Sequence, residues 1–359
     1  MRLRSRAPGR ICLFGEHQDY MGFPVIAAAI DLTIDIHGTV VPGERVRLQL
    51  PDLGETEDFS CLDFTYTRPR DYFRSTVRVL QKQGLFSAME IDARVRGTIP
   101  IQAGTSSSSA LVVAWCGFLL FAQGRRSEWE DDPTRVGELA YLAEVAEFHE
   151  SGGRMDQFTS AAGGIVFIEF DGKTVLQRLP AHMKAFVLGD SHQPKDTLKT
   201  LRRIRSGQEG GLREIQRHIP ADTLHRLGAS DIDGILPRIS PEFRPYLRAV
   251  LLNRSITLDA HAELSRPHPD IDRLCLWMNR HHEVLRDDLA ISTPKIERMI
   301  ESALTAGAKA AKINGSGEGG CMFAFCPGRQ EAVAEAVRAA GGTPYVINVG
   351  EGLHVQEIE

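Results

Sequence analysis

The sequence predicts an α+β fold, because strand-like and helix-like segments alternate along it without forming a repeated βαβ unit. A chain of 359 residues with 42% hydrophobic and 25% charged residues is large enough for two modest globular domains. The net charge of −5 predicts no attraction to nucleic acid, and the longest apolar run, 110–122, is too short to cross a membrane. Six scattered cysteines form no disulfide framework or metal motif, so we expect a cytoplasmic protein.

The first hundred residues carry most of the strand signals. Apolar runs bounded by glycine, proline and acidic residues predict strands at 9–14 and 24–30. Segments 33–41 and 45–50 predict a hairpin around Pro42 and Gly43. Residues 90–95 alternate between polar and apolar types with a period of two, which predicts a half-exposed strand.

Helices enter after residue 106. Segment 107–123 is apolar on nearly every face, so we expect it to lie between two layers, and 134–149 has the pattern of an amphipathic helix. The expected later strands are 163–169, 186–190, 309–313 and 321–325, with helical patterns dominating 194–305. These patterns predict one domain over 1–184 and a second over 185–359, whose last strands can pack back on the first.

The segment 100–110 joins a glycine to four consecutive serines and continues into the buried helix. Glycine lets a ligand approach the backbone closely, and the first turn of a helix leaves amide donors unpaired at the positive end of its dipole. This combination predicts a phosphate site, to which the hydroxyls add donors or a Mg²⁺ ligand. The alternative is that the serines only cap the helix.

A second glycine-rich segment lies near the end of the chain. Gly315, Gly317 and Gly320 match the dinucleotide pattern GxGxxG, but a strand-like run follows instead of a helix, so the context excludes that function. A tight hairpin is the alternative interpretation. Because a hairpin needs only one or two glycines, the excess favours a loop that closes over a ligand.

Two acidic segments complete the set of candidate functional residues. Glu16, His17 and Asp19 follow an apolar strand and can bind several hydroxyl groups of a sugar, although a polar turn has the same composition. Asp156 follows the glycine pair at 152–153 and opens a helix pattern. It is either a helix cap or, if the other segments converge on it, a general base.

Together these segments resemble the three motifs of the GHMP small-molecule kinases, in family order and over essentially the whole chain. The run GEHQDY at 15–20 resembles the signature of galactokinases and N-acetylgalactosamine kinases, whereas mevalonate kinases share only GEH. The run MDQF at 155–158 resembles the galactokinase element with the catalytic aspartate. The resemblance implies a ribosomal-protein-S5-like N-terminal domain, a ferredoxin-like C-terminal domain and an active site between them.

The resemblance also implies a role for each matching residue. Asp156 would be the base that takes the proton of the acceptor hydroxyl, and Arg10 would stabilise charge on the attacking oxygen. The implied substrate contacts are Glu16, His17, Asp19, Gly153 and Arg154. The implied ATP contacts are Gly104, Thr105, Ser106, Ser107, Ser108, Gly315, Gly317 and Gly319. Mg²⁺ would be held by Ser108 and by either Glu144 or Glu147.

The chain departs from the family pattern at Cys12, where asparagine is usual, at Asn314, where threonine is usual, and at Arg154, which places a cation beside the implied base. The resulting hypothesis is an ATP- and Mg²⁺-dependent kinase for the anomeric hydroxyl of galactose or a galacto-configured relative. Arg154 adds the side hypothesis that this sugar carries a carboxylate. The alternatives are a mevalonate-type kinase and a sugar- and ATP-binding sensor without catalysis.

Overall fold

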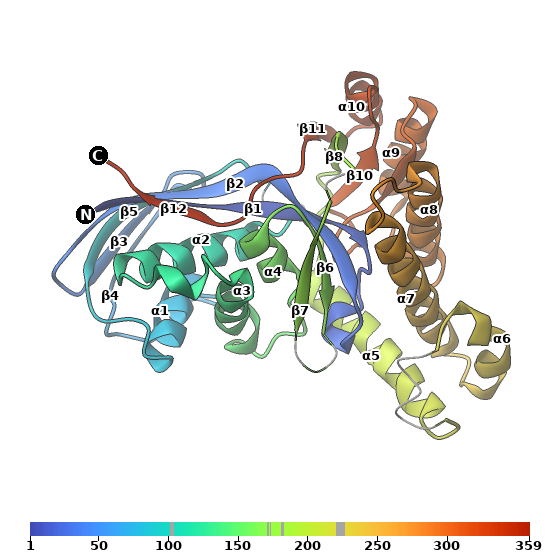
Figure 1. The fold of residues 1–359 in the computed structure, drawn as a ribbon, viewed down its shortest axis with the longest axis horizontal. Helices are drawn as coiled ribbons and strands as arrows, with labels where there is room; N and C mark the ends of the chain where they lie inside the picture. Colours follow the sequence, from blue (N-terminus) through green and yellow to red (C-terminus); the bar gives the residue numbers. More distant parts are fainter. Residues whose placement is uncertain (101–103, 171, 173, 181–182, 220–226) are drawn as a thin grey trace.

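Figure 1 shows the computed structural model, which describes residues 1–359 except 101–103, 171, 173, 181–182 and 220–226. Residues 101–103 of the expected phosphate segment therefore lie outside the described part. The chain forms two bodies, each built on its own sheet and covered by helices. The α+β fold class is confirmed, because antiparallel pairs predominate and, among the described strands, only β3 and β5 pair in parallel.

The first sheet contains eight strands and forms the larger body. Its strands are β1 (Arg2–Phe14), β2 (Val25–Val41), β3 (Arg45–Leu50), β4 (Glu55–Ser60), β5 (Glu90–Gly97), β6 (Ile165–Glu169), β7 (Val175–Leu179) and β12 (His354–Glu357). Their order is β12-β1-β2-β5-β3-β4, while β6 pairs with the beginning of β2 and also with β7. The strands predicted at 24–30 and 33–41 are thus parts of one long strand, β2.

The predicted hairpin of 33–41 with 45–50 is wrong, because β5 lies between these segments. The chain does turn after Val41, but Val41 pairs with Glu90 of β5, and Val46 of β3 pairs with Ile91 in parallel. A local turn signal predicts that the chain reverses; it does not specify which strand becomes the neighbour. Burial of the alternating apolar residues of β5 decides that, and it depends on contacts distant in sequence.

Helices cover one face of this sheet. They are α1 (Tyr72–Lys82), α2 (Ser107–Ala122), α3 (Pro133–Tyr141) and α4 (Met155–Ala162), together with the 3₁₀ turns η1 (Asp19–Met21) and η2 (Arg126–Glu128). Helix α2 packs against β1 and β2 on one side and against α1 and α3 on the other, as its uniformly apolar sequence predicts. The predicted helix 134–149 is shorter, because α3 continues into a π-helical turn, η3 (Leu142–Ala146).

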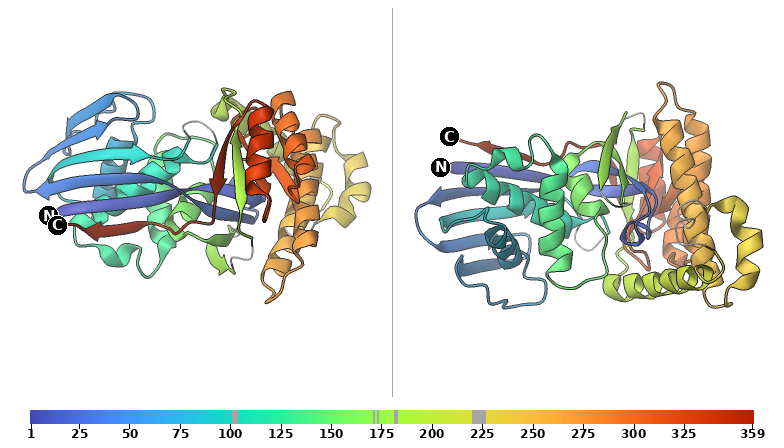
Figure 2. Two further views of the ribbon diagram at one scale, coloured as in Figure 1. Left: turned by 90° about the horizontal axis from the view of Figure 1, so that it is seen from above. Right: turned by 60° about the horizontal axis from the view of Figure 1, so that its bottom comes forward.

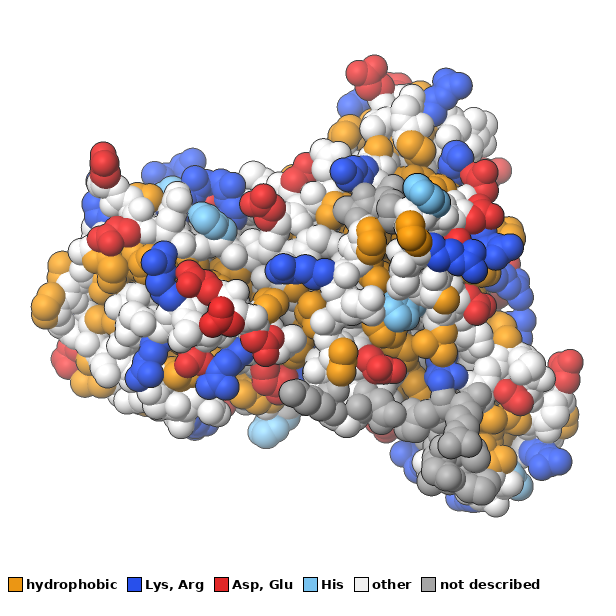
Figure 3. All heavy atoms as spheres, in the orientation of Figure 1, with side chains coloured by type: hydrophobic (Ala, Val, Ile, Leu, Met, Phe, Trp, Pro, Cys, Tyr) orange, Lys and Arg blue, Asp and Glu red, His pale blue; other side chains and the backbone are white. Residues whose placement is uncertain are grey.

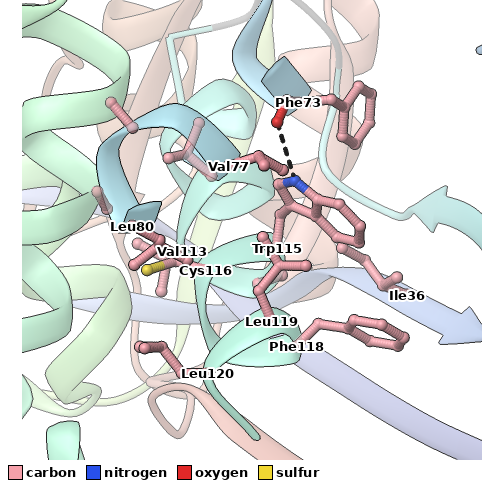
Figure 4. Close-up of a cluster of buried hydrophobic side chains, with 14 of the residues drawn as sticks. Ile36, Phe73, Val77, Leu80, Val113, Trp115, Cys116, Phe118, Leu119 and Leu120 are labelled. Carbon is pink, nitrogen blue, oxygen red and sulfur yellow. Dashed lines mark hydrogen bonds between the residues drawn. The ribbon is translucent and has the colours of Figure 1, made fainter. Parts of the chain in front are cut away.

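The core between these helices and the sheet is centred on Trp115 of α2 (Figure 4). The Trp115 ring is fully buried and lies within 5.8 Å of the Phe73 ring and 5.5 Å of the Phe118 ring, measured between centroids. Its indole N–H donates to the Phe73 carbonyl oxygen at 3.2 Å. This bond satisfies the one polar atom of a side chain that otherwise has only apolar neighbours.

The second body has a four-stranded antiparallel sheet. Its strands β8 (Phe186–Asp190), β9 (Ala310–Ile313), β10 (Cys321–Phe325) and β11 (Thr343–Ile347) lie in the order β11-β8-β10-β9. Its helices are α5 (Thr197–Ile215), α6 (Ile232–Ile235), α7 (Arg244–Leu264), α8 (Ile271–Asp287), α9 (Pro294–Thr305) and α10 (Gln330–Ala339), with 3₁₀ turns η5 (Ala229–Asp231) and η6 (Leu236–Arg238). This is the ferredoxin-like arrangement expected for the C-terminal part, enlarged by extra helices.

The two bodies share a continuous apolar core where β1 ends. Ile11 and Phe14 pack in one cluster with Met278 of α8 and Phe323 of β10. After β11 the chain returns to the first body, and β12 pairs antiparallel with β1, which places the two termini side by side (Figures 1 and 2). The predicted boundary at 184–185 falls between β7 and β8 and stays a prediction.

The surface combines charges of both signs. On the face shown in Figure 3, acidic and basic side chains are interspersed over both bodies. Within the described residues, no helix has both the length and the apolar character that crossing a membrane requires.

We expect Trp115→Ala to lower the free energy of unfolding by about 3–5 kcal/mol, because it removes a buried ring and leaves a cavity. Urea denaturation would measure this change. Leu276→Ala is the control: Leu276 is 67% exposed on α8, so its loss should change stability by less than about 0.5 kcal/mol. Equal effects of the two substitutions would contradict this account of the core.

Candidate active site

A cavity of about 560 Å³ gathers most of the predicted site residues in one place. Its lining includes Arg10, Glu16, His17, Asp19, Gly104, Ser106, Ser107, Ser108, Glu144, Gly153, Asp156 and Gly315. Five predicted residues are not part of the lining: Thr105, Glu147, Arg154, Gly317 and Gly319. All three glycine-containing motifs and Asp156 therefore converge, which is the condition under which Asp156 becomes a candidate base.

The Asp156 carboxylate lies in the first turn of α4 and is held by two neighbours. Arg10 of β1 donates to both of its oxygens, from Nε at 2.7 Å and from Nη2 at 2.8 Å. The Ser106 hydroxyl donates to Oδ2 at 2.5 Å. Burial alone would lower the pKa of Arg10, but the charge and hydrogen bonds of Asp156 outweigh it and raise that pKa.

Ser106 is the residue before α2, and it does not cap the helix with its side chain. Its backbone has a φ of 59°, in the left-handed region that residues other than glycine rarely adopt. Because its hydroxyl is directed to Asp156, the first-turn amides of α2 receive no side-chain acceptor from this position. The geometry thus favours the anion site over the alternative in which the serines only cap the helix.

The carbonyl of Gly104 is the point where three segments meet. It accepts hydrogen bonds from Arg10 Nη1 at 2.7 Å and from Asn314 Nδ2 at 3.0 Å. Gly315 lies against it, because a Cβ atom at position 315 would be 2.8 Å from the same oxygen and φ there is +75°. Gly317 and Gly319 instead pack against Ile291 and Gln193. Residues 314–320 form the third motif, and residues 104–109 are called the phosphate loop. The third motif therefore supports the phosphate loop through residues 314 and 315.

The two backbone-motif departures, Cys12 and Asn314, contact each other. The Cys12 amide donates to Asn314 Oδ1 at 2.9 Å, while Asn314 Nδ2 reaches the Gly104 carbonyl. One amide side chain thus connects β1 with the phosphate loop through its acceptor and its donor at once. A threonine has one hydroxyl group in place of a separate carbonyl oxygen and amide nitrogen. Asn314 therefore makes this connection with two different atoms, one accepting and one donating.

The structure separates the two candidate Mg²⁺ glutamates. Glu144 is buried in η3, contacts the Ser108 and Ser109 hydroxyls, and accepts from Gln157 Nε2 at 2.6 Å. Burial raises the pKa of Glu144. Glu147 lies outside the cavity. It accepts a hydrogen bond from the Tyr66 hydroxyl at 2.8 Å and forms ion pairs with Arg78 and Lys82, each at 3.2 Å.

The residues beside the phosphate loop fit a hard cation. Ser108 and Glu144 offer hydroxyl and carboxylate oxygens, the ligand types that Mg²⁺ prefers, and phosphate oxygens and water complete its usual shell. Among the described residues there is no cluster of three or more histidine, cysteine, aspartate or glutamate side chains suited to a metal. A two-ligand Mg²⁺ site at Ser108 and Glu144 needs no such cluster.

The first motif, residues 15–20, contacts the start of α4 next to Asp156. Asp19 Oδ2 accepts from the Met155 amide at 3.1 Å, and burial raises the pKa of Asp19. A Cβ atom at position 153 would overlap Asp19 Oδ2, so any side chain there would displace the Asp19 carboxylate. His17 contacts the Tyr20 hydroxyl and the Ser316 carbonyl oxygen, each at 3.2 Å. Burial lowers the pKa of His17 to about 4, so the imidazole is neutral at pH 7.

Glu16 is buried and has a partner that the sequence reasoning missed. Lys312 of β9 is itself fully buried and bonds to Glu16 Oε1 and to the Cys12 carbonyl oxygen, the latter at 3.0 Å. Glu16 Oε2 has no hydrogen-bond partner among the described residues and lies 3.6 Å from His281 Nδ1. A lysine inside the apolar run of β9 was the available signal, since lysine is rarely buried unless it is paired.

Arg154 does not reach the cavity of Asp156. Its guanidinium lies 3.2 Å from Glu138 and stacks over the Tyr141 ring at 4.6 Å. It lines a smaller neighbouring cavity of about 120 Å³ instead. Because Glu138 already balances its charge, the location of Arg154 does not favour the side hypothesis of a carboxylate-bearing sugar.

A second missed residue, Lys195, does line the main cavity. It precedes α5, and its Nζ donates to Ser316 Oγ at 3.2 Å. Burial lowers the pKa of Lys195 to about 8. The stretch 195–200 is similar to a mevalonate-kinase pattern, but the sequence reasoning gave Lys195 no role, because a lysine before a helix start is ordinary. Only the packing of the second body brings it to the cavity.

Family models match three parts of the chain. Residues 71–164 match the GHMP kinases N-terminal domain, and residues 260–343 match the GHMP kinases C-terminal region. Residues 3–39 match the galactokinase galactose-binding signature. Together these matches cover more than half of the sequence. They include all three motifs and Asp156.

Whole-chain comparisons find two kinds of relative. The chain is 28% identical to mevalonate kinase of Pyrococcus furiosus, over 100% of this chain and 99% of that protein. It is 26% identical to galactokinase of Actinobacillus succinogenes, over 98% of this chain and 94% of that protein. Sequence similarity is therefore slightly greater to the mevalonate kinase.

Similarity of fold has the reverse order. The structure of Lactococcus lactis galactokinase complexed with galactose matches with a TM-score of 0.84 at 20% identity, covering 98% of this chain and 95% of that one. The structure of L. major mevalonate kinase in complex with R-mevalonate matches with a TM-score of 0.67 at 18% identity, covering 97% and 96%. At these identities the two matches describe the fold and not the substrate.

We expect Glu144→Gln to raise the Mg²⁺ concentration needed for half-maximal binding of AMPPNP by at least about tenfold, because it removes a charged oxygen ligand beside the phosphate loop. Calorimetric titration at a series of Mg²⁺ concentrations would measure it. Glu147→Gln is the matched control: it should leave the Mg²⁺ requirement unchanged and alter stability by no more than about 1 kcal/mol. A Mg²⁺ effect confined to Glu147→Gln would assign the ligand to that residue instead.

Proposed function

The chain belongs to the GHMP kinase superfamily, and on that premise we propose that it transfers the γ-phosphoryl group of ATP to the anomeric hydroxyl of galactose or a galacto-configured relative. One observation carries the proposal. Asp156 lies between the phosphate loop, through Ser106, and the first motif, through the Met155 amide that binds Asp19. A base at this junction can serve an acceptor on one side and a phosphoryl donor on the other.

In the proposed reaction, the acceptor hydroxyl displaces the Ser106 hydroxyl from Asp156 Oδ2 and gives its proton to that carboxylate. The acceptor oxygen then forms a bond to the γ-phosphorus as the bond between that phosphorus and the β-phosphate oxygen breaks, and ADP leaves. Arg10 stabilises charge on the attacking oxygen while it holds Asp156. Amides at the start of α2 stabilise the phosphate oxygens.

Mg²⁺, when bound, neutralises charge on the phosphate oxygens during such a transfer. Ser108 and Glu144 are the residues that would hold it, since both offer oxygen ligands beside the phosphate loop. The protein's remaining contribution is to orient the two substrates and to exclude water, because phosphoryl transfer requires little covalent chemistry from side chains.

The first motif supports a sugar as the acceptor. The galactose-binding signature spans residues 3–39, and Asp19 presents its carboxylate to the cavity beside the close-packed Gly153. Carboxylates accept hydrogen bonds from hydroxyl groups. A sugar offers several hydroxyl groups on adjacent carbons, whereas the two hydroxyl groups of mevalonate are not on adjacent carbons. Mevalonate remains the second candidate acceptor, because the chain is more similar in sequence to mevalonate kinase than to galactokinase.

We expect the chain to release ADP from MgATP with one sugar of a panel of acceptors. Asp156→Asn keeps the shape of the side chain but removes the base, so it should lower kcat about 10²–10⁴-fold. The panel should contain galactose, N-acetylgalactosamine, L-arabinose, a uronic acid and mevalonate.

Other outcomes of this assay would contradict the proposal in distinct ways. Turnover of mevalonate alone would assign the second candidate function. Sugar and ATP binding by calorimetry without turnover of any panel member would indicate a sensor. Full activity of Asp156→Asn would exclude Asp156 as the base, whatever the acceptor.

A further inference from the structure

Lys195 extends from the second body to the phosphate loop of the first. It lies in the segment between β8 and α5, and its Nζ bonds to Ser316 Oγ of the third motif at 3.2 Å. A Cβ atom built on Gly104 would lie 2.9 Å from the same nitrogen. The ammonium group therefore lies between the third motif and the first glycine of the phosphate loop, on the wall of the main cavity.

The charge of Lys195 is not balanced by an ion pair, in contrast to the arginines of the same cavity. Arg10 is bidentate to Asp156, and Arg70 is bidentate to Glu150 at 2.5 and 2.8 Å. Within the described part of the chain, Lys195 has one hydrogen bond, to a neutral hydroxyl, and no ion pair. A half-buried ammonium without an anion is unfavourable, so the site favours an anionic ligand at this point.

We propose that Lys195 is a catalytic residue that contacts the terminal phosphate of ATP and holds it during transfer. The proposal rests on the proposed kinase function but not on the identity of the acceptor. Proximity to Gly104 favours phosphate over a carboxylate of the acceptor, because Gly104 belongs to the loop that opens the anion site of α2.

In this step Lys195 keeps its three protons and donates hydrogen bonds to oxygens of the γ-phosphoryl group. The acceptor oxygen bonds to phosphorus, the bond to the β-phosphate oxygen breaks, and the acceptor's proton passes to Asp156. The cation balances charge on the three equatorial oxygens, which the transition state spreads over them. Since ADP lacks the γ-phosphoryl group, this contact predicts a preference for the triphosphate.

Calorimetry with MgADP and with Mg-AMPPNP tests the contact without any acceptor. A hydrogen-bonded charge pair contributes about 1.5–3 kcal/mol, so Lys195→Met should weaken Mg-AMPPNP binding about 10- to 100-fold. MgADP binding should change by less than about twofold, since a factor of two is well below one such contact. Lys195→Arg should restore most of the affinity for AMPPNP, because it keeps a cation at this position.

Lys199→Met is the matched control, because Lys199 is an exposed lysine in the first turn of α5, four residues after Lys195. It removes an equal charge four residues further along the chain, in the first turn of α5, and should leave both nucleotide affinities unchanged. Equal losses for ADP and AMPPNP in Lys195→Met, or no loss for either, would overturn the proposal. Unchanged nucleotide binding with lost discrimination between acidic and neutral acceptors would assign Lys195 to an acceptor carboxylate. Failure of the wild-type chain to bind any nucleotide would overturn the kinase function itself.

The pH dependence of AMPPNP affinity gives a second readout. The lowered pKa of Lys195, about 8, means that the ammonium is charged below pH 8 and loses its charge above it. Wild-type affinity should therefore fall as the pH rises through about 8, and Lys195→Arg should lack this fall because an arginine stays charged. The titratable groups that face Lys195 are Arg10, His17, Asp156, Asp190 and Cys321.

Two titratable neighbours of Lys195, His17 and Cys321, would not cause a fall in AMPPNP affinity near pH 8. His17 has a pKa of about 4, far below it, and burial raises the pKa of the Cys321 thiol above its ordinary value. If the AMPPNP affinity of Lys195→Arg also fell as the pH rose through about 8, the assignment to Lys195 would be contradicted.

Discussion

The site depends on one buried guanidinium, that of Arg10. Three of its nitrogens are used at once: Nε and Nη2 bind the two oxygens of Asp156, and Nη1 binds the Gly104 carbonyl. One side chain thus sets the distance between Asp156, the proposed base, and Gly104. A guanidinium is planar and its donors have a fixed geometry, so Arg10 holds Asp156 and Gly104 at a well-defined separation. A lysine has a single flexible ammonium group and would fix this separation less strictly.

Strand β1 carries Arg10 and connects the two bodies. Its first residues pair with β12, and its last residues enter the apolar core that β1 shares with α8 and β10. The third motif attaches to the same strand, since Asn314 binds the Cys12 amide and Lys312 binds the Cys12 carbonyl. Lys195 and Asn314 are two side chains of the second body that reach Gly104.

The chain combines features of two kinds of GHMP kinase. Its identity to mevalonate kinase is slightly higher over the whole length, whereas residues 3–39 match the galactokinase galactose-binding signature. Whole-chain identity reflects every position, most of which serve packing. The acceptor is selected by the few groups that line the cavity, and among them Asp19 and its fit against Gly153 support a polyhydroxyl acceptor.

The sequence alone determined the elements and motifs whose signals are local. The fold class, helix α2 and the strand-like runs follow from composition and periodicity, and the three motifs with Asp156 follow from short spacings. The convergence of these motifs was implied by family resemblance and not by the residues themselves. The same local signals gave a wrong hairpin, because the neighbour of β2 is a strand fifty residues further along the chain.

Tertiary structure decided whatever depends on the direction of a side chain or on distant partners. Glu144 and Glu147 are three residues apart, a spacing that puts side chains on one face of an α-helix. The π-helical turn widens the spiral, so one carboxylate faces the serines and the other faces α1. Arg154 pairs with Glu138, and Lys195 and Lys312 reach the site from the second body. Such pairings join residues far apart in sequence, and local periodicity contains no information about them.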